Sequence, residues 1–233
     1  MTRMVEYSLR CACLGSWIVQ HSQFLQAHNT YYHCKQLLPT VRIDRLLAWS
    51  MYPKKVPILP DDYFVDHMKI HNTMQCRFNS FCIGDLLIID SWSELVHQLF
   101  RRKEQEFISN FCDLAEDVKN QVESVGRISA NNLYSLYKCT IEYLVQVKNV
   151  RAIVIIDFPA LYDNKPKMRN RSKQISKALL KIDQENLPFR YVSIPFRAIA
   201  CHGDGHPYHF SRDTVCKYSL ALDKVLIDLN LHI

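Results

Sequence analysis

The chain has few glycines, only 5 in 233 residues, and this scarcity bears on its fold. Sandwiches and barrels made of many short strands need frequent tight turns, and those turns favour glycine. The sequence also lacks any run approaching the ~20 apolar residues that a membrane-spanning helix needs. A many-turned β architecture and a membrane-spanning protein are therefore both disfavoured.

The sequence lacks a convincing secretion signal, because Glu6 and Arg10 interrupt the apolar stretch at its start. Its 9 cysteines are an odd number and show no framework spacing. We therefore expect reduced thiols and a cytoplasmic or nuclear location. The formal net charge of +6 is compatible with a polyanionic partner but does not require one.

Short apolar runs alternate with amphipathic ones along the whole chain. The strands that we expect cover 7–15, 43–51, 84–90, 150–161 and 189–194. The helices that we expect cover about 97–122, 133–147, 175–182 and a last stretch from about 212. Residues 52–80 hold three prolines and predict loop with a short helix. This alternation predicts a single domain over 1–233, a three-layer α/β sandwich with a mostly parallel central sheet.

Three blocks from residue 85 onward carry a resemblance to a known family. They are "DLLIIDSWSELV", "VIIDFPALYDN" and "DGHPYHFSRDTVCKYSLALDKVL", and an earlier turn, "CLGSWI", precedes them. In order and rough spacing these blocks resemble the SGNH (GDSL-like) hydrolase superfamily over most of the chain. The resemblance implies an SGNH/flavodoxin-like fold, with a nucleophilic serine after the first strand and an acid–base dyad before the last helix.

On this resemblance the catalytic triad consists of Ser16 as nucleophile, His209 as base and Asp204 as the group that orients it. Ser93 stands where the family has its oxyanion-hole asparagine. The family's aspartate is absent beside Ser16, and Asp204 lies two residues earlier than the family's spacing requires. Losing one oxyanion donor costs roughly 10²–10³ in turnover. These departures favour a catalytically silent relative, and a serine esterase with this triad is the alternative.

The segment after the strand at 150–161 is strongly basic and holds no acidic residue between 164 and 177. Its cations are Lys165, Lys167, Arg169, Arg171, Lys173 and Lys177. We expect a basic loop at the rim of the former active site, where it could pair with phosphates while Tyr208 and other aromatic side chains stack on unpaired bases. The plainer interpretation is a solvated loop leading into a surface helix.

Cysteines and histidines near the C-terminus raise the question of a zinc site. They are Cys201, His202, His206, His209 and Cys216. Their spacing lacks the Cys-x₂-Cys pair that is usual in zinc sites, so we expect loop histidines with a core thiol, and neither a metal nor a cofactor.

A second polar group, Asp61, Asp62, Asp66 and His67, predicts an exposed helix start rather than a site. The function that we predict is therefore a non-catalytic SGNH-like module, since the superfamily includes a member that has lost its catalytic residues and binds RNA. Its partner is expected to be single-stranded RNA or a protein.

Overall fold

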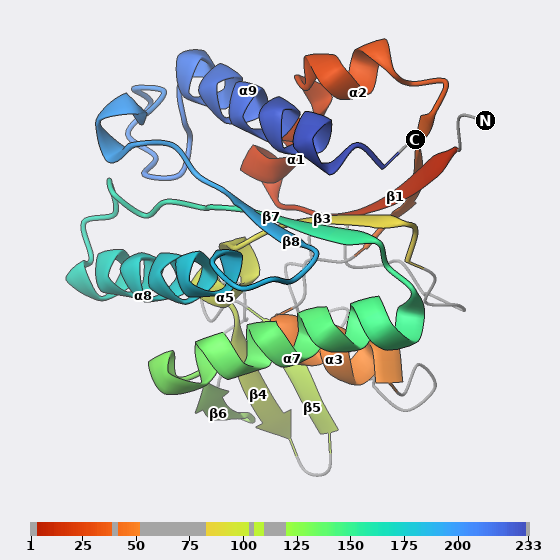
Figure 1. The fold of residues 1–233 in the computed structure, drawn as a ribbon. Coiled ribbons are helices and arrows are strands. Elements are labelled where there is room, and N and C mark those ends of the chain that lie inside the picture. The colour runs from red at the N-terminus through yellow and green to blue at the C-terminus, as the bar shows by residue number, and fades with distance from the viewer. Residues whose placement is uncertain (1–3, 39–41, 52–82, 103–104, 110–119, 232–233) are drawn as a thin grey trace.

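A five-stranded parallel sheet forms the centre of the molecule (Figure 1). The computed structural model describes residues 4–38, 42–51, 83–102, 105–109 and 120–231. The strand order is β2-β1-β3-β7-β8, and each neighbouring pair is parallel. The strands are β1 (Val5–Arg10), β2 (Tyr32–Leu37), β3 (Leu86–Asp90), β7 (Ala152–Ile156) and β8 (Phe189–Val192).

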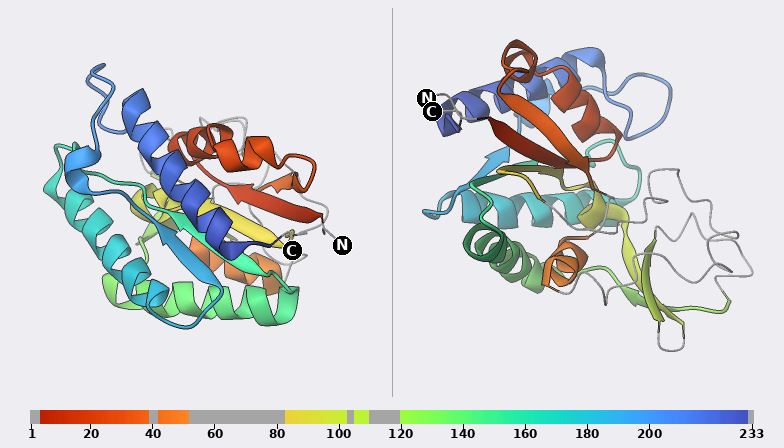
Figure 2. Two further views of the ribbon diagram at one scale, coloured as in Figure 1. Left: turned by 45° about the horizontal axis from the view of Figure 1, so that its top comes forward. Right: turned by 90° about the vertical axis from the view of Figure 1, so that its right-hand side faces the viewer.

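Helices cover both faces of this sheet, which confirms the predicted three-layer α/β sandwich (Figures 1 and 2). One face carries α1 (Cys13–Gln20), α2 (Gln23–Ala27) and α9 (Arg212–Leu229). The other face carries α3 (Ile43–Met51), α7 (Ala130–Lys148) and α8 (Pro166–Asp183). The short helix α5 (Trp92–Val96) follows β3, and the 3-10 turn η3 (Phe196–Ala198) follows β8.

A smaller antiparallel sheet lies on the α3 and α7 side of the main sheet (Figure 1). Its order is β5-β4-β6, with strands β4 (Gln98–Arg102), β5 (Gln105–Ser109) and β6 (Glu123–Gly126). We predicted one helix over 97–122, and the strands at 98–102 and 105–109 show that this prediction was wrong.

The central strands have the most apolar sequences, because helices cover them on both sides. All five residues of β3 and all five of β7 are buried. The predicted strands at 84–90 and 189–194 and the helices at 133–147 and from 212 are confirmed, and the strand predicted over 150–161 is present but ends at Ile156. The segment 43–51 is helix α3 rather than the predicted strand, and 13–15 begins α1 rather than ending β1.

None of the helices in the described part of the chain is both long and apolar enough to cross a membrane. The predicted loop and short helix at 52–80, with Asp61, Asp62, Asp66 and His67, lie outside the described residues.

Candidate functional site

The strand order creates a topological switch point between β1 and β3. From β1 the chain adds β2 on one side, and from β3 it adds β7 and β8 on the other. In open parallel sheets, ligands bind beyond the carboxyl ends of the strands at such a point. The turn from β1 to α1 and the turn from β3 to α5 therefore form the first place to look for a site.

Asp90, the last residue of β3, fills this switch point with a buried carboxylate. Its Oδ2 accepts a hydrogen bond from the Ala12 backbone N–H at 2.6 Å, and its Oδ1 accepts one from the Trp92 N–H at 3.3 Å. Burial raises the pKa of Asp90 to about 7, although Arg10 and these backbone donors oppose the rise. A Cβ on Gly15 would lie 2.6 Å from Oδ2, which explains the glycine there.

The two serines assigned catalytic roles lie on separate helices, and within the described residues neither forms a hydrogen bond with the predicted base. Ser16 lies within α1, partly buried, and its hydroxyl donates to the Cys11 carbonyl at 3.5 Å. In the part of the chain that the structure describes, Ser16 forms no hydrogen bond with His209. Ser93 in α5 is 1% exposed, and its hydroxyl has no hydrogen-bond partner there. The roles of nucleophile and oxyanion donor therefore stay predictions.

The predicted dyad residues, by contrast, are in direct contact. His209 Nδ1 lies 2.6 Å from Asp204 Oδ2, and Asp204 Oδ1 accepts the backbone N–H of His206 at 2.9 Å. Gly203 and Gly205 adopt φ values of 95° and 80°, which only glycine adopts readily, and they fold the loop so that Asp204 meets both partners. The hydrogen bond from His209, followed by that from His206, lowers the pKa of Asp204.

We call residues 200–211 the histidine loop, and its two ends are pinned together. Cys201 and Phe210 form an antiparallel bridge, and the His202 N–H donates to the His209 carbonyl at 2.7 Å. The Tyr208 ring packs edge-on against Trp92, with centroids 4.9 Å apart. The loop is therefore a closed, ordered element even though most of its residues are exposed.

Two tyrosine hydroxyls join the histidine loop region to the segment that begins α8. Tyr208 donates to the Asp163 carboxylate, and Tyr162 donates to the Ile199 carbonyl at 2.6 Å. Asp163 also accepts the Lys165 backbone N–H at 2.6 Å, so it lies at the start of α8. These bonds place the first lysines of α8 next to the histidine loop.

The basic segment is the first part of α8 rather than the loop that we predicted. Its exposed cations are Lys165, Lys167, Lys173 and Lys177. Arg169 is half-buried and donates to the Asp163 carbonyl. Arg171 is 8% exposed, and its Nε donates to the Glu94 carbonyl at 3.1 Å. Arg171 therefore lies in the interior rather than among the exposed cations, and its contact with phosphates stays a prediction that its burial disfavours.

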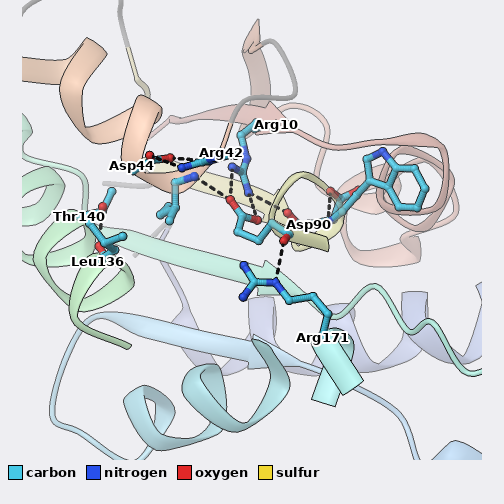
Figure 3. Close-up of polar contacts among 10 residues, drawn as sticks. Arg10, Arg42, Asp44, Asp90, Leu136, Thr140 and Arg171 are labelled. Atoms are coloured by element: carbon cyan, nitrogen blue, oxygen red, sulfur yellow. Dashed lines mark hydrogen bonds and ion pairs between the residues drawn. The ribbon is translucent and has the colours of Figure 1, made fainter. Parts of the chain in front are cut away.

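A buried ion pair that the sequence did not reveal lies beneath the switch point (Figure 3). Arg10 and Glu94 are both fully buried and form a forked pair, with N–O distances of 3.0 and 3.2 Å. Arg10 also donates to the Asp90 carbonyl at 2.8 Å, and Glu94 accepts the Ile43 N–H at 2.7 Å. Burial by itself lowers the pKa of Arg10, but the attraction and hydrogen bond of Glu94 outweigh it and raise that pKa.

The described residues include no group of three or more His, Cys, Asp or Glu that could hold a metal ion. The histidine loop contributes imidazoles that pair with Asp204 or with each other instead. Cys201 and Cys216 are half-buried free thiols.

The likeness to SGNH hydrolases stays a prediction, because five parallel strands in this order also occur in flavodoxin-like proteins of other function. What the chain does must therefore be inferred from its own residues. No model of a known protein family matches the chain, and neither does any curated protein.

Proposed function

We propose that this chain is a non-catalytic module that binds single-stranded RNA at the carboxyl edge of its sheet. The binding surface consists of the histidine loop and the first turns of α8. The observation that carries the proposal is that hydrogen bonds from Tyr208 to Asp163 and from Tyr162 to Ile199 join the histidine loop and the residue before it to the segment that leads into α8.

The charge of this surface favours a polyanion. Lys165, Lys167, Lys173 and Lys177 are exposed, and none forms a salt bridge within the described residues. Such lysines can neutralise phosphates and release condensed counterions, which gives salt-dependent binding. A nucleic acid fits this arrangement better than an ordinary protein surface, which carries charges of both signs.

The aromatic side chains favour a single strand over a duplex. Tyr162 is 48% exposed beside Lys165, and His206 and His209 are exposed on the loop. Unpaired bases can stack on such rings, whereas the bases of a duplex are already stacked on each other.

The switch point supports a binding rather than a catalytic role. Acyl transfer needs a nucleophile hydrogen-bonded to its base, and N–H donors that are free to bind the developing oxyanion. The Ser16 hydroxyl donates to a carbonyl at 3.5 Å, and the Asp90 carboxylate already takes the N–H groups of Ala12 and Trp92. These two N–H donors at the switch point are therefore occupied.

One observation favours the alternative, a serine esterase with Ser16, His209 and Asp204. The Asp204–His209 contact at 2.6 Å has the geometry of an acid that orients a base. Hydrolysis of p-nitrophenyl acetate that disappears in Ser16→Ala would establish this alternative and overturn the non-catalytic proposal.

RNA binding is tested by fluorescence anisotropy with a labelled 12-nucleotide single strand at several salt concentrations. We expect the affinity to fall steeply as salt rises. In a Lys165→Ala/Lys167→Ala/Lys173→Ala/Lys177→Ala variant, the slope of log K against log salt should become shallower by about 3, because each phosphate contact contributes about 0.7.

A matched control removes four lysines that lie elsewhere on the molecule, namely Lys35, Lys148, Lys217 and Lys224. Both variants lose the same net charge, so a general electrostatic effect would change them equally. Equal loss in the two variants, or no binding by the wild-type protein, would refute the proposed surface.

A further inference from the structure

Two histidine rings of the histidine loop stack on each other at the surface. The ring centroids of His206 and His209 are 4.0 Å apart, and their planes differ by 25°. Both residues are exposed, and half of the His209 side-chain surface is accessible, 49%. Exposed aromatic rings held face to face offer the kind of flat surface on which a nucleobase stacks.

The stacked pair is held in place by bonds to its own loop. Asp204 binds the His209 ring through Oδ2 and the His206 backbone N–H through Oδ1, so one carboxylate fixes both residues. The backbone of His209 is fixed as well, since its carbonyl accepts the His202 N–H at 2.7 Å. A pre-ordered surface loses little conformational entropy when a ligand binds.

Tyr208, which lies between the two histidines in sequence, connects the pair to the protein interior. Its ring contacts Trp92 and Phe158, with centroids 4.9 and 6.0 Å away, and its hydroxyl donates to Asp163. Asp163 in turn accepts the backbone N–H of Lys165 at 2.6 Å. The histidine pair and the first lysines of α8 are thus held at a fixed separation through one tyrosine and one aspartate.

We infer that the stacked rings of His206 and His209 form a platform on which an unpaired base stacks, and that this platform gives the preference for single-stranded RNA. This inference rests on the proposed RNA-binding function and names the residues that distinguish unpaired bases from a duplex. Lys165 and Lys167 bind the backbone phosphates next to the stacked base. Tyr208 and Asp204 are positioning residues, because they hold the platform without contacting the base.

The test compares a labelled 12-nucleotide uridine strand, an abasic strand with the same backbone, and a 12-base-pair RNA duplex. In a His206→Ala/His209→Ala variant, we expect affinity for the uridine strand to fall by about tenfold or more, the scale of one lost base stack. Affinity for the abasic strand and the salt slope should not change, because the lysines are intact. A His206→Tyr variant keeps an aromatic ring and should retain affinity for the uridine strand.

A control variant, His21→Ala/His33→Ala, removes two exposed histidines from other elements and should bind like the wild-type protein. The inference is overturned if the platform variant binds the uridine strand as tightly as wild type, or if it loses the abasic strand equally. If the wild-type protein binds RNA but does not prefer the uridine strand to the abasic one, only the platform is refuted. If the wild-type protein binds none of the three, the proposed function itself fails.

Discussion

The buried carboxylate of Asp90 makes a quantitative prediction about stability and pH. The pKa of Asp90 rises from 3.8 to about 7, chiefly because burial disfavours its charged form. Between these two values the folded protein holds a proton that the unfolded chain has released. The contribution of this protonation to the free energy of unfolding is therefore fully present below about pH 4, and it is lost as pH rises through 7.

The size of the effect follows from the two pKa values. At pH 5 the folded-state pKa lies 2 units above the solution pH, whereas at pH 8 the carboxylate is ionised in both states. One pKa unit corresponds to about 1.4 kcal/mol, so Asp90 contributes about 2.5 kcal/mol more stability at pH 5 than at pH 8. The substitution Asp90→Asn removes this titration and keeps one acceptor for the N–H groups of Ala12 and Trp92.

Urea unfolding of the wild-type protein and Asp90→Asn at pH 5 and pH 8 measures the effect. The difference in the free energy of unfolding between the two proteins should move by about 2.5 kcal/mol in favour of the variant as pH rises. Other buried groups that titrate in this range, such as Asp157, are present in both proteins and cancel. A difference that is the same at both pH values would show that Asp90 does not titrate with a raised pKa.

Two further substitutions probe the core by chemical denaturation. Glu94→Gln leaves the guanidinium of Arg10 buried without its counter-charge and should cost about 3–5 kcal/mol, whereas Glu123→Gln, at an exposed pair, should cost less than about 1 kcal/mol; equal losses would contradict the structure. Gly84→Ala places a Cβ 2.3 Å from the Glu6 carbonyl oxygen and should cost about 1–3 kcal/mol, and an unchanged free energy of unfolding would refute this close approach.

The elements predicted correctly are those whose burial follows a single local sequence pattern. The continuous β-branched run of β7 predicts a buried strand. The apolar spacing of α7 and α9 predicts helices with one buried face. The helix predicted over 97–122 was wrong because Phe100 and Phe107 are seven residues apart, a helical spacing. In the structure they are directly opposite each other in register across the β4–β5 pair. A seven-residue spacing fits both arrangements, so the spacing alone does not distinguish them.

The segment 43–51 shows the opposite error. We predicted a strand here, but Asp44 and Arg45 occupy the more exposed side of a helix whose buried side carries Ile43, Leu46 and Ser50. Spacing of three and four residues between the buried positions is typical of a helix. This element could have been predicted correctly from the sequence.

For the candidate site, the sequence indicated the residues but not their geometry. The contact between Asp204 and His209 depends on the positive φ angles of Gly203 and Gly205, which compensate for the unusual spacing. The burial of Arg171 could have been anticipated, because it lies at helical spacing between the apolar Met168 and Ile175.

No local sequence pattern indicated the buried ion pair of Arg10 and Glu94 or the buried carboxylate of Asp90. Arg10 and Glu94 are 84 positions apart, and nothing local to either residue shows that the other will neutralise it. Their pairing depends on β1 lying beside β3 in the sheet.

The same separation in sequence constrains the order in which the elements can fold during synthesis. Glu94 binds Arg10 and the Ile43 N–H through its side chain and Arg171 through its carbonyl, so a single residue links β1, α3, α5 and α8. A nascent chain that ends before residue 94 lacks the carboxylate against which Arg10 is buried. During synthesis, the first strand and α3 must therefore wait for the middle of the chain before they reach their native positions. The segment before residue 94 therefore leaves the ribosome before the carboxylate that neutralises Arg10 has been added to the chain.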